Sequence, residues 1–403
     1  MNTTPLPAPL AHRTTLWQWR KPAFWFFAVI LLATTILSLF MQLGFASLSP
    51  EGWVLSWLLM LVYAIPMFLL VYFLDLYERE PLSLVFGALL WGAFASTLLS
   101  IVASTGWQDV AFSLLGENAL EWGAAVIAPP IEEILKGAGV LFIALIARDE
   151  IDDLLDGFVY GAVVGLGFTV VEDVLYFIGV FGGSIGGVLE GFFIRVVASG
   201  LYGHMLYSGL FGIGVAFFVT RRGRVPTARR VLIAGGLIAI GIVGHALWNS
   251  PLLYFFPDAL SSPGDYFQLV LATTLKGAPL LVFVIVMVRL ARRREHRWLQ
   301  TALKDEIGGP GIHEVEMATL SNPSARRRSR KEMKARSGPI AAATLKRLQK
   351  AQIDLAMMRT RSDDPEHPDL VRQREYCASL RSWLVTYAGP GGTDGPQNAS
   401  SNT

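Results

Sequence analysis

Long apolar segments, separated by short polar loops, recur along roughly the first 290 residues of the chain. Each segment is at least about 20 residues long, which is the length that a helix needs to cross the hydrocarbon core of a bilayer. The pattern predicts transmembrane helices at residues 24–45, 53–74, 82–104, 122–147, 157–181, 192–220, 231–250 and 267–289. We therefore expect an all-α, polytopic membrane protein with about eight transmembrane helices.

The composition supports this fold class. Hydrophobic residues make up 53% of the chain and charged residues only 16%, and the mean hydropathy is +0.46. A soluble domain carries about 25% charged residues, so the composition argues against a soluble enzyme. The first apolar segment is too long for the core of a signal peptide, and we expect it to be a retained anchor. The single cysteine, Cys377, excludes an intrachain disulfide.

Lysine and arginine are distributed unevenly between the predicted loops. The loops that contain neither residue are 46–52, 105–121, 182–191 and 251–266. The alternate loops and the two ends of the chain carry Arg79, Arg148, a cluster at 221–230 and the basic run from Arg289 onward. Because basic loops stay on the cytoplasmic side of a membrane, we expect both termini in the cytoplasm and the chain in the plasma membrane.

This topology divides the chain into a cytoplasmic N-terminal tail at 1–23, a membrane domain at 24–290 and a basic cytoplasmic tail at 291–403. Residues 340–358 and 368–387 of the last part have helical patterning, and its Gly-rich end is expected to be disordered. Basic residues next to a membrane bind anionic lipid headgroups. We therefore expect lipid, and not nucleic acid, as the partner of this charge.

Few ionisable side chains lie inside the predicted spans, and they gather in the second half of the membrane domain. They are Glu132, Glu133, Lys136, Glu172, Asp173, His204, His245 and Lys276. A carboxylate at mid-membrane costs at least about 2.5–3.5 kcal/mol on insertion scales, so such residues are expected where they have a function. Glu133, Glu172, His204 and His245 each lie about 14–16 residues, or roughly 21–24 Å, from the cytoplasmic end of their spans. Four helices would therefore place these side chains in one layer.

A layer with two histidines and several carboxylates suits metal-assisted hydrolysis. His204, His245 and Glu172 could hold a divalent metal, with zinc (Zn2+) the usual choice, and leave one position for water. The metal would lower the pKa of that water, and Glu132 or Glu133 would accept its proton.

A mechanism without metal is also open. The two glutamates would share a proton, and the ionised one would activate water while a histidine and Asn249 stabilise the oxyanion. Asn249 follows His245 by one helical turn, so both face the same way. Pro129 and Pro130 break the helical hydrogen bonding just before the glutamates, which could admit water or only kink the helix. Either mechanism hydrolyses an acyl group, most simply a peptide bond.

These residues also have purely structural explanations. Either histidine alone could form an interhelical hydrogen bond, and Lys136 could simply neutralise the glutamates one turn away. Glu172 and Asp173 could form an acid pair with a lysine such as Lys276, and Arg195, near the outer end of its span, could extend to the headgroups.

Two other classes of protein use polar residues in a membrane. A secondary transporter or proton pathway would need acids and histidines of this kind, but usually has broken helices in both halves of an inverted repeat. One proline-broken span is present, without a counterpart in the first half. A non-catalytic scaffold is the third possibility. We favour the protease.

Several short motifs occur in the order of a known family. They are DLYEREP at 75–81, EEILK at 132–136, GFTVVED at 167–173, GHMLYSG at 203–209 and GHALWN at 244–249. On these residues the chain resembles the PrsW family of intramembrane proteases, which is related to the superfamily of CAAX-prenyl endopeptidases and bacteriocin-immunity proteases. The resemblance covers roughly residues 53–249, so the basic tail lies outside it.

The resemblance implies a membrane-embedded peptidase that cleaves a membrane protein substrate, such as an anti-sigma factor or another regulatory protein. It implies catalytic roles for Glu132, Glu133 and Asn249, and a site completed by Glu172, His204 and His245. The chain departs from the expected pattern at Asp173, where the resemblance leads us to expect asparagine. The added negative charge needs a partner or a proton.

Overall fold

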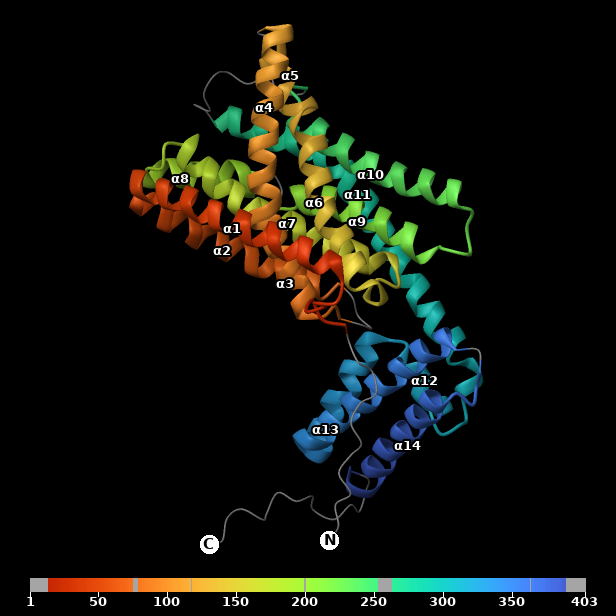
Figure 1. The fold of residues 1–403 in the computed structure, drawn as a ribbon. Helices are drawn as coiled ribbons and strands as arrows, with labels where there is room; N and C mark the ends of the chain where they lie inside the picture. The colour runs from red at the N-terminus through yellow and green to blue at the C-terminus, as the bar shows by residue number, and fades with distance from the viewer. Residues whose placement is uncertain are drawn as a thin grey trace. The chain divides into compact units, whose positions relative to one another are not determined.

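The computed structural model describes residues 14–74, 79–116, 118–198, 201–252, 263–362 and 364–388, which form two compact units. One unit is Thr14–Ala291, and the other contains the described residues from Arg292 onward. Every named element in these ranges is a helix (Figure 1), and one isolated bridge joins Ile307 and Ile312. The predicted all-α fold class is confirmed.

The first unit contains ten helices and most of an eleventh within the described ranges. They are α1 (Pro22–Leu48), α2 (Pro50–Tyr72), α3 (Leu82–Leu90), α4 (Thr97–Leu115), α5 (Asn118–Val126), α6 (Ala128–Ile146), α7 (Leu154–Gly179), α8 (Ile185–Phe192), α9 (Gly203–Thr220), α10 (Thr227–Asn249) and most of α11 (Pro263–Ala302). A π-helical turn at Trp91–Ser96 joins α3 to α4, and another at Phe193–Ala198 follows α8.

Seven helical segments in the described ranges are long and apolar enough to cross a membrane. They are α1, α2, the α3–α4 segment (Leu82–Leu115), α7, α9, α10 and the segment Gly264–Glu306 that contains most of α11. The predicted span 122–147 is not among them because Ile127 divides it into α5 and α6, and α6 carries three charged residues. The chain is therefore a multi-pass membrane protein.

Two further predicted spans differ from the structure. The span predicted at 82–104 continues as helix to Leu115. The span predicted as continuous at 192–220 is interrupted, because the π-helical turn ends at Ala198 and α9 begins only at Gly203. Leu201, between them, has a φ of 55°, a left-handed conformation that a right-handed helix cannot contain. Short breaks of this kind escape detection because they leave the average hydropathy unchanged.

Helix α7 lies at the centre of the first unit, and every residue from 155 to 168 is buried. It packs closely along α9 through glycines. A Cβ atom added at Gly161 would lie 2.1 Å from the carbonyl oxygen of Ser208, and one at Gly165 would lie 2.4 Å from that of His204. Only glycine permits this approach of two backbones. The start of α9, with His204, is thereby held against α7.

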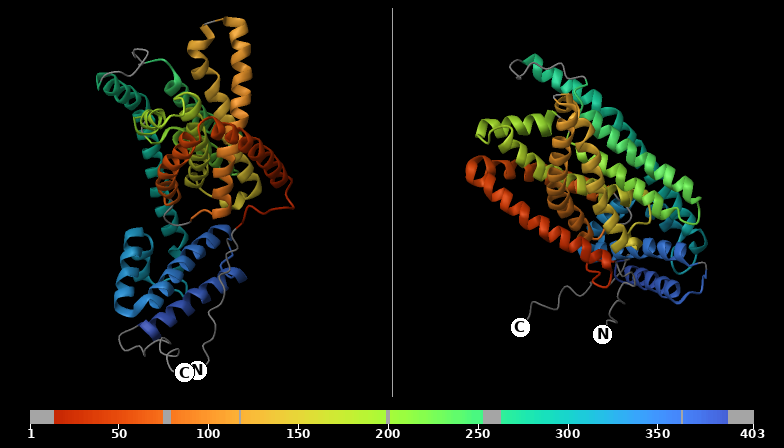
Figure 2. Two further views of the ribbon diagram at one scale, coloured as in Figure 1. Left: turned by 90° about the vertical axis from the view of Figure 1, so that its left-hand side faces the viewer. Right: turned by 45° about the horizontal axis from the view of Figure 1, so that its top comes forward.

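The second unit is built from α12 (Glu314–Leu320), α13 (Pro323–Arg361) and α14 (Pro368–Ala388). Helices α13 and α14 pack along each other (Figure 2). Helix α13 has a kink at Gly338, whose φ is 83°. Cys377 is fully buried in the small apolar core of this unit.

Candidate active site

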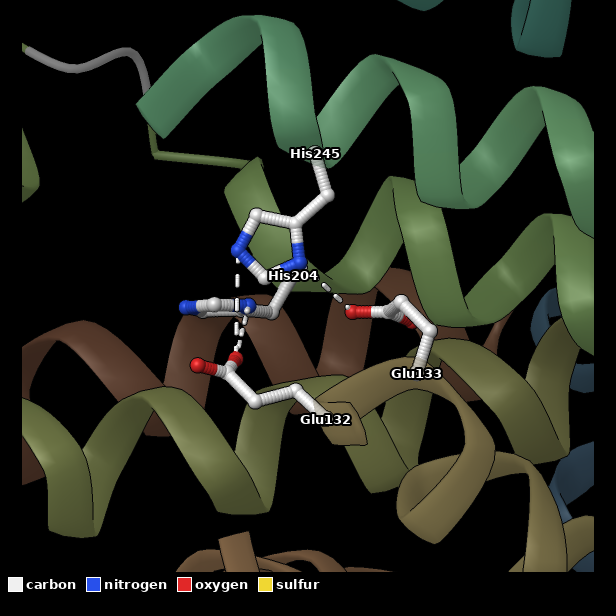
Figure 3. A group of neighbouring side chains, drawn as sticks. All are labelled: Glu132, Glu133, His204 and His245. Atoms are coloured by element: carbon white, nitrogen blue, oxygen red, sulfur yellow. Dashed lines mark hydrogen bonds and ion pairs between the residues drawn. The ribbon is translucent and has the colours of Figure 1, made fainter. Parts of the chain in front are cut away.

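Two glutamates of α6 and two histidines of α9 and α10 meet inside the first unit (Figure 3). They are Glu132, Glu133, His204 and His245, and each offers a ligand atom within 4.8 Å of those of the others. Glu133 and His245 are each 1% exposed and Glu132 is 7% exposed. Residues that the sequence placed in one layer thus converge in space.

The beginning of α6 sets the position of the glutamates. The chain breaks at Ile127, and α6 begins at Ala128 with Pro129 and Pro130 in its first turn. Proline is tolerated there because the first amide groups of a helix have no helical acceptor. Ala128 also lines the cavity beside the site. The break at the proline pair is therefore next to the cavity.

Lys136 neutralises the glutamate pair. Its ammonium nitrogen lies 2.8 Å from Oε1 of Glu133 and 3.1 Å from Oε2 of Glu132. It also lies 2.9 Å from Nδ1 of His204 and 3.7 Å from the centre of the Phe168 ring. The lysine is fully buried, which is tolerable for an ammonium group only when it is paired in this way.

Glu133 is held on both of its oxygens. Oε1 accepts a hydrogen bond from Lys136 and lies 3.0 Å from Nδ1 of His245. Oε2 accepts a hydrogen bond from the Ser208 hydroxyl at 2.8 Å. Sequence reasoning missed Ser208, although it follows His204 by four residues and so faces the same side of α9.

Glu132 has different surroundings. Its hydrogen bond and ion pairs with the described residues involve Oε2, which lies 3.1 Å from Lys136, 3.8 Å from Nε2 of His245 and 4.0 Å from Nδ1 of His204. Glu132, but not Glu133, is among the described residues that line the cavity. Of the two glutamates, Glu132 is the one that water in the cavity can reach.

Each imidazole is held by a carboxylate through the nitrogen that faces away from Glu132. Nε2 of His204 lies 3.0 Å from Oε2 of Glu172, and Nδ1 of His245 lies 3.0 Å from Oε1 of Glu133. An ionised carboxylate can only accept hydrogen bonds, so in the neutral rings these nitrogens carry the proton. Nδ1 of His204 and Nε2 of His245 then carry lone pairs and lie 4.0 and 3.8 Å from Oε2 of Glu132, and Nδ1 of His204 also accepts from Lys136 at 2.9 Å.

Asn249 lies one turn beyond His245 and lines the same cavity, as its spacing predicted. Its side-chain nitrogen donates to the carbonyl oxygen of Ala124 at 3.1 Å and lies 3.4 Å from Nε2 of His245. The amide therefore links the end of α10 to α5 beside the histidine.

Arg195, and not Lys276, is the partner of the acid pair on α7. Nε of Arg195 lies 2.5 Å from Oδ1 of Asp173, and Nη2 lies 2.8 Å from Oε2 of Glu172. Lys276 instead donates to the carbonyl oxygen of Ser250 at 2.6 Å, at the end of α10. The sequence allowed Arg195 to extend to the headgroups, but in the structure it pairs with the two acids instead. The signal that could have identified it was the unmatched negative charge of the pair.

A cavity of about 160 Å³ adjoins these groups. Its lining includes the charged and polar residues Glu132, Glu172, Arg195, His204, His245 and Asn249. Five of the six site residues that the sequence indicated therefore line one cavity, and the sixth, Glu133, lies directly behind His245.

The donor set fits a zinc ion. Oε2 of Glu132, Nδ1 of His204 and Nε2 of His245 face one another, and two imidazoles with one carboxylate are a usual zinc-binding set. A carboxylate on the far nitrogen of each imidazole is the arrangement that commonly surrounds metal-binding histidines. In this structure the Lys136 ammonium contacts two of these three donor atoms, Oε2 of Glu132 and Nδ1 of His204. Glu172 contacts Nε2 of His204, on the side of the ring away from Glu132, and is not one of the four residues whose ligand atoms lie within 4.8 Å of one another.

Comparison with known proteins assigns the chain to a family. The family model described as PrsW family intramembrane metalloprotease matches residues 80–291, which is more than half of the chain. This range contains all the site residues described above.

Two curated relatives are each named Protease PrsW. The protein of Geobacillus kaustophilus is 35% identical over 105 residues, which are 26% of this chain and 44% of that protein. The protein of Clostridioides difficile is 32% identical over 102 residues, which are 25% of this chain and 42% of that protein. The chain thus spans less than half the length of the relatives that it matches, and no solved structure matches it. On the family match, which confirms the resemblance seen in the motifs, the chain belongs to the PrsW family of intramembrane metalloproteases.

Proposed function

We propose that this protein is an intramembrane endopeptidase that hydrolyses a peptide bond of a membrane protein substrate. The observation that carries the proposal is the meeting of Glu132 with His204 and His245 at a cavity inside the membrane-spanning unit. Buried acids and histidines are costly in a membrane. Here they face a common centre with the donor atoms that hydrolytic chemistry needs.

Glu132, His204 and His245 would hold the zinc ion, and Glu133 and Glu172 would each orient one imidazole. When bound, zinc lowers the pKa of a coordinated water molecule and makes it a nucleophile near neutral pH. In this assignment Glu132 replaces Glu172 as the carboxylate ligand that the sequence predicted, and Glu172 instead orients His204.

Glu132 accepts the proton of the attacking water. Its Oε2 faces the two imidazoles, whereas none of its hydrogen bonds or ion pairs with the described residues involves Oε1. Oε1 is therefore the atom that can take the proton and return it to the leaving amine. A positioned general base of this kind contributes about 100- to 10,000-fold in rate.

Asn249 and Lys136 complete the assignment. The side-chain nitrogen of Asn249 lies beside His245 at the cavity wall and can donate to the oxyanion that forms at the scissile carbonyl. Lys136 balances the charge of the two glutamates. The transporter alternative is not favoured, because the family and its named relatives are proteases.

We propose further that the chain lies in the plasma membrane, that α5 and α6 together form an eighth crossing beside the seven long helical segments, and that both termini are therefore in the cytoplasm. We also propose that the basic tail binds anionic lipid headgroups. The loops without lysine or arginine support this orientation. In the second unit, Arg327, Arg328, Lys331 and Lys334 are exposed on α13, as a lipid-binding surface requires. Binding of nucleic acid is not expected.

The test is a comparison of membrane proteomes from cells that produce the wild-type protein or the Glu132→Gln variant. A membrane protein that is shortened only in wild-type cells is the expected result and identifies the substrate. Glu190→Gln is the matched control, because Glu190 is exposed on α8, and it should give the wild-type pattern. Identical proteomes for wild type and Glu132→Gln would contradict the proposal.

A further inference from the structure

Arg195 forms a clamp on α7 that the reaction described above does not use. Its Nε lies 2.5 Å from Oδ1 of Asp173, its Nη2 lies 2.8 Å from Oε2 of Glu172, and its guanidinium carbon lies 3.7 Å from the centre of the Tyr176 ring. The three partners lie on one face of α7, at spacings of three and four residues. A planar guanidinium can meet two carboxylates and an aromatic face together, which the single ammonium of lysine cannot do.

One oxygen atom connects this clamp to the active site. Oε2 of Glu172 accepts from Arg195 and also lies 3.0 Å from Nε2 of His204. The carboxylate therefore holds the proton of His204 on Nε2, and the lone pair of Nδ1 lies 2.9 Å from the Lys136 ammonium and 4.0 Å from Oε2 of Glu132. The side chains of Arg195 and Glu172 are 24% and 16% exposed at the cavity. Without the guanidinium, Glu172 could turn away from His204 toward water.

His204 depends on such contacts because the helix before it is interrupted. The π-helical turn that carries Arg195 ends at Ala198, and α9 begins at Gly203, one residue before His204. A continuous helix therefore does not fix the position of α9 relative to the π-helical turn. The contact from Arg195 through Glu172 to His204 connects them across the break.

Asp173 takes part in the clamp through one oxygen only. Its Oδ1 contacts Arg195, and its Oδ2 is buried without a hydrogen-bond partner among the described residues. The negative charge of Asp173 therefore relies on the guanidinium. Arg195 is thus the partner that the added negative charge of Asp173 needs, at a position where asparagine was expected.

We infer that Arg195 is a positioning residue, whose guanidinium holds Glu172 on Nε2 of His204 and so directs Nδ1 of His204 toward the metal-binding centre. The inference rests on the proposed function, because it assigns a purpose to the orientation of a metal-binding histidine. Arg195 acts through Glu172 and needs no contact with the substrate.

The test is a double-mutant cycle on zinc binding by the full-length protein in lipid nanodiscs, with zinc alone titrated against a competing fluorescent chelator. The proteins are wild type, Arg195→Ala, Glu172→Gln and the double variant. We expect each single change to weaken zinc binding by about 10- to 100-fold, because the loss of a group that holds a metal-binding histidine in place has an effect of this size. We expect the double variant to bind about as weakly as either single variant, because both changes remove one interaction.

Two further variants serve as controls. Arg195→Lys should restore part of the affinity, since an ammonium can reach one of the two carboxylates. Arg230→Ala removes another buried arginine, which donates to the carbonyl oxygen of Phe218 far from the site, and should leave zinc binding unchanged. Wild-type affinity in Arg195→Ala, or losses that multiply in the double variant, would overturn the inference.

A second readout separates this inference from the proposed function. If the wild-type protein binds no zinc, the metal assignment fails, and the same four proteins are compared by the amount of shortened membrane protein found in cells. Equal losses in the two single variants and in the double variant would still support Arg195 acting through Glu172. A further loss in the double variant would show a separate role, such as direct contact with the substrate, and would overturn it.

Discussion

Replacing each glutamate of α6 by glutamine should separate the chemistry of the site from its stability. The two changes are the same in chemical terms, one oxygen for an NH2 group, and they affect adjacent residues. Glu133 has close contacts on both oxygens, with Lys136, His245 and Ser208 at 2.8–3.0 Å. Glu132 has one hydrogen bond, at 3.1 Å, and faces the cavity.

The magnitudes follow from these contacts. A hydrogen bond to a charged group contributes about 1.5–3 kcal/mol, and removing one partner of a buried ion pair costs about 3–5 kcal/mol. Glutamine at 133 keeps an acceptor for Lys136 but loses the charge, so we expect a loss of roughly 2–5 kcal/mol in the free energy of unfolding. Glutamine at 132 leaves the Lys136–Glu133 pair in place and should cost at most about 2 kcal/mol.

Activity should show the opposite order. Glu132→Gln removes both a proposed metal ligand and the group that accepts the water proton, and should lower the cleavage rate by at least about 100-fold. Glu133→Gln disturbs only the orientation of His245 and should lower the rate by about 10- to 100-fold. The assays are thermal unfolding in detergent and cleavage of the full-length form of the membrane protein that wild-type cells shorten. A Glu133→Gln protein as stable as wild type, or an active Glu132→Gln protein, would refute this division of roles.

Three predictions concern other parts of the molecule. Burial raises the pKa of Asp153, which caps the N-terminus of α7, from 3.8 to about 6. The folded state therefore holds this proton more tightly than the unfolded state, and the free energy of unfolding falls as the pH rises from about 4 to 6. In pH-dependent melting, Asp153→Asn should remove that fall and add up to about 3 kcal/mol of stability at pH 7. Burial also raises the pKa of the Cys377 thiol to about 12, so a maleimide at pH 7 should label it only after denaturation, and fast labelling of the folded protein would count against a buried core in the second unit. A Cβ at position 212 would lie 1.8 Å from the carbonyl oxygen of Gly157, so Gly212→Ala should lower the free energy of unfolding by at least about 1–3 kcal/mol. A Cβ at position 235 would have nothing within 4 Å, so Gly235→Ala should be neutral or stabilising in the same melting assay.

The sequence predicted the fold class because apolar segments of membrane length are unmistakable, and it predicted most of the site because buried charge in such segments is rare. The common depth of Glu133, Glu172, His204 and His245 indicated that they would meet. Which atoms face one another was not predictable, because the rotation of a helix about its axis is hard to read when all its sides are apolar.

Arg195 shows this limit most clearly. Its distance from the membrane surface suggested contact with headgroups, but the π-helical turn at Phe193–Ala198 directs it to Asp173 and Glu172. The exchange of Glu172 for Glu132 in the proposed ligand set has the same origin. Spacing along the chain predicts how deep a residue lies in the membrane, but only the packed structure shows which neighbours its side chain faces.

Hydrolysis in water enriched in oxygen-18 tests the central claim most directly. The purified wild-type protein would be reconstituted in liposomes with the membrane protein that wild-type cells shorten, and the fragments would be analysed by mass spectrometry. We predict two fragments, with one oxygen-18 atom in the new carboxyl terminus, and no fragments with Glu132→Gln. An intact substrate with the wild-type protein, or equal cleavage by the Glu132→Gln variant, would contradict the account.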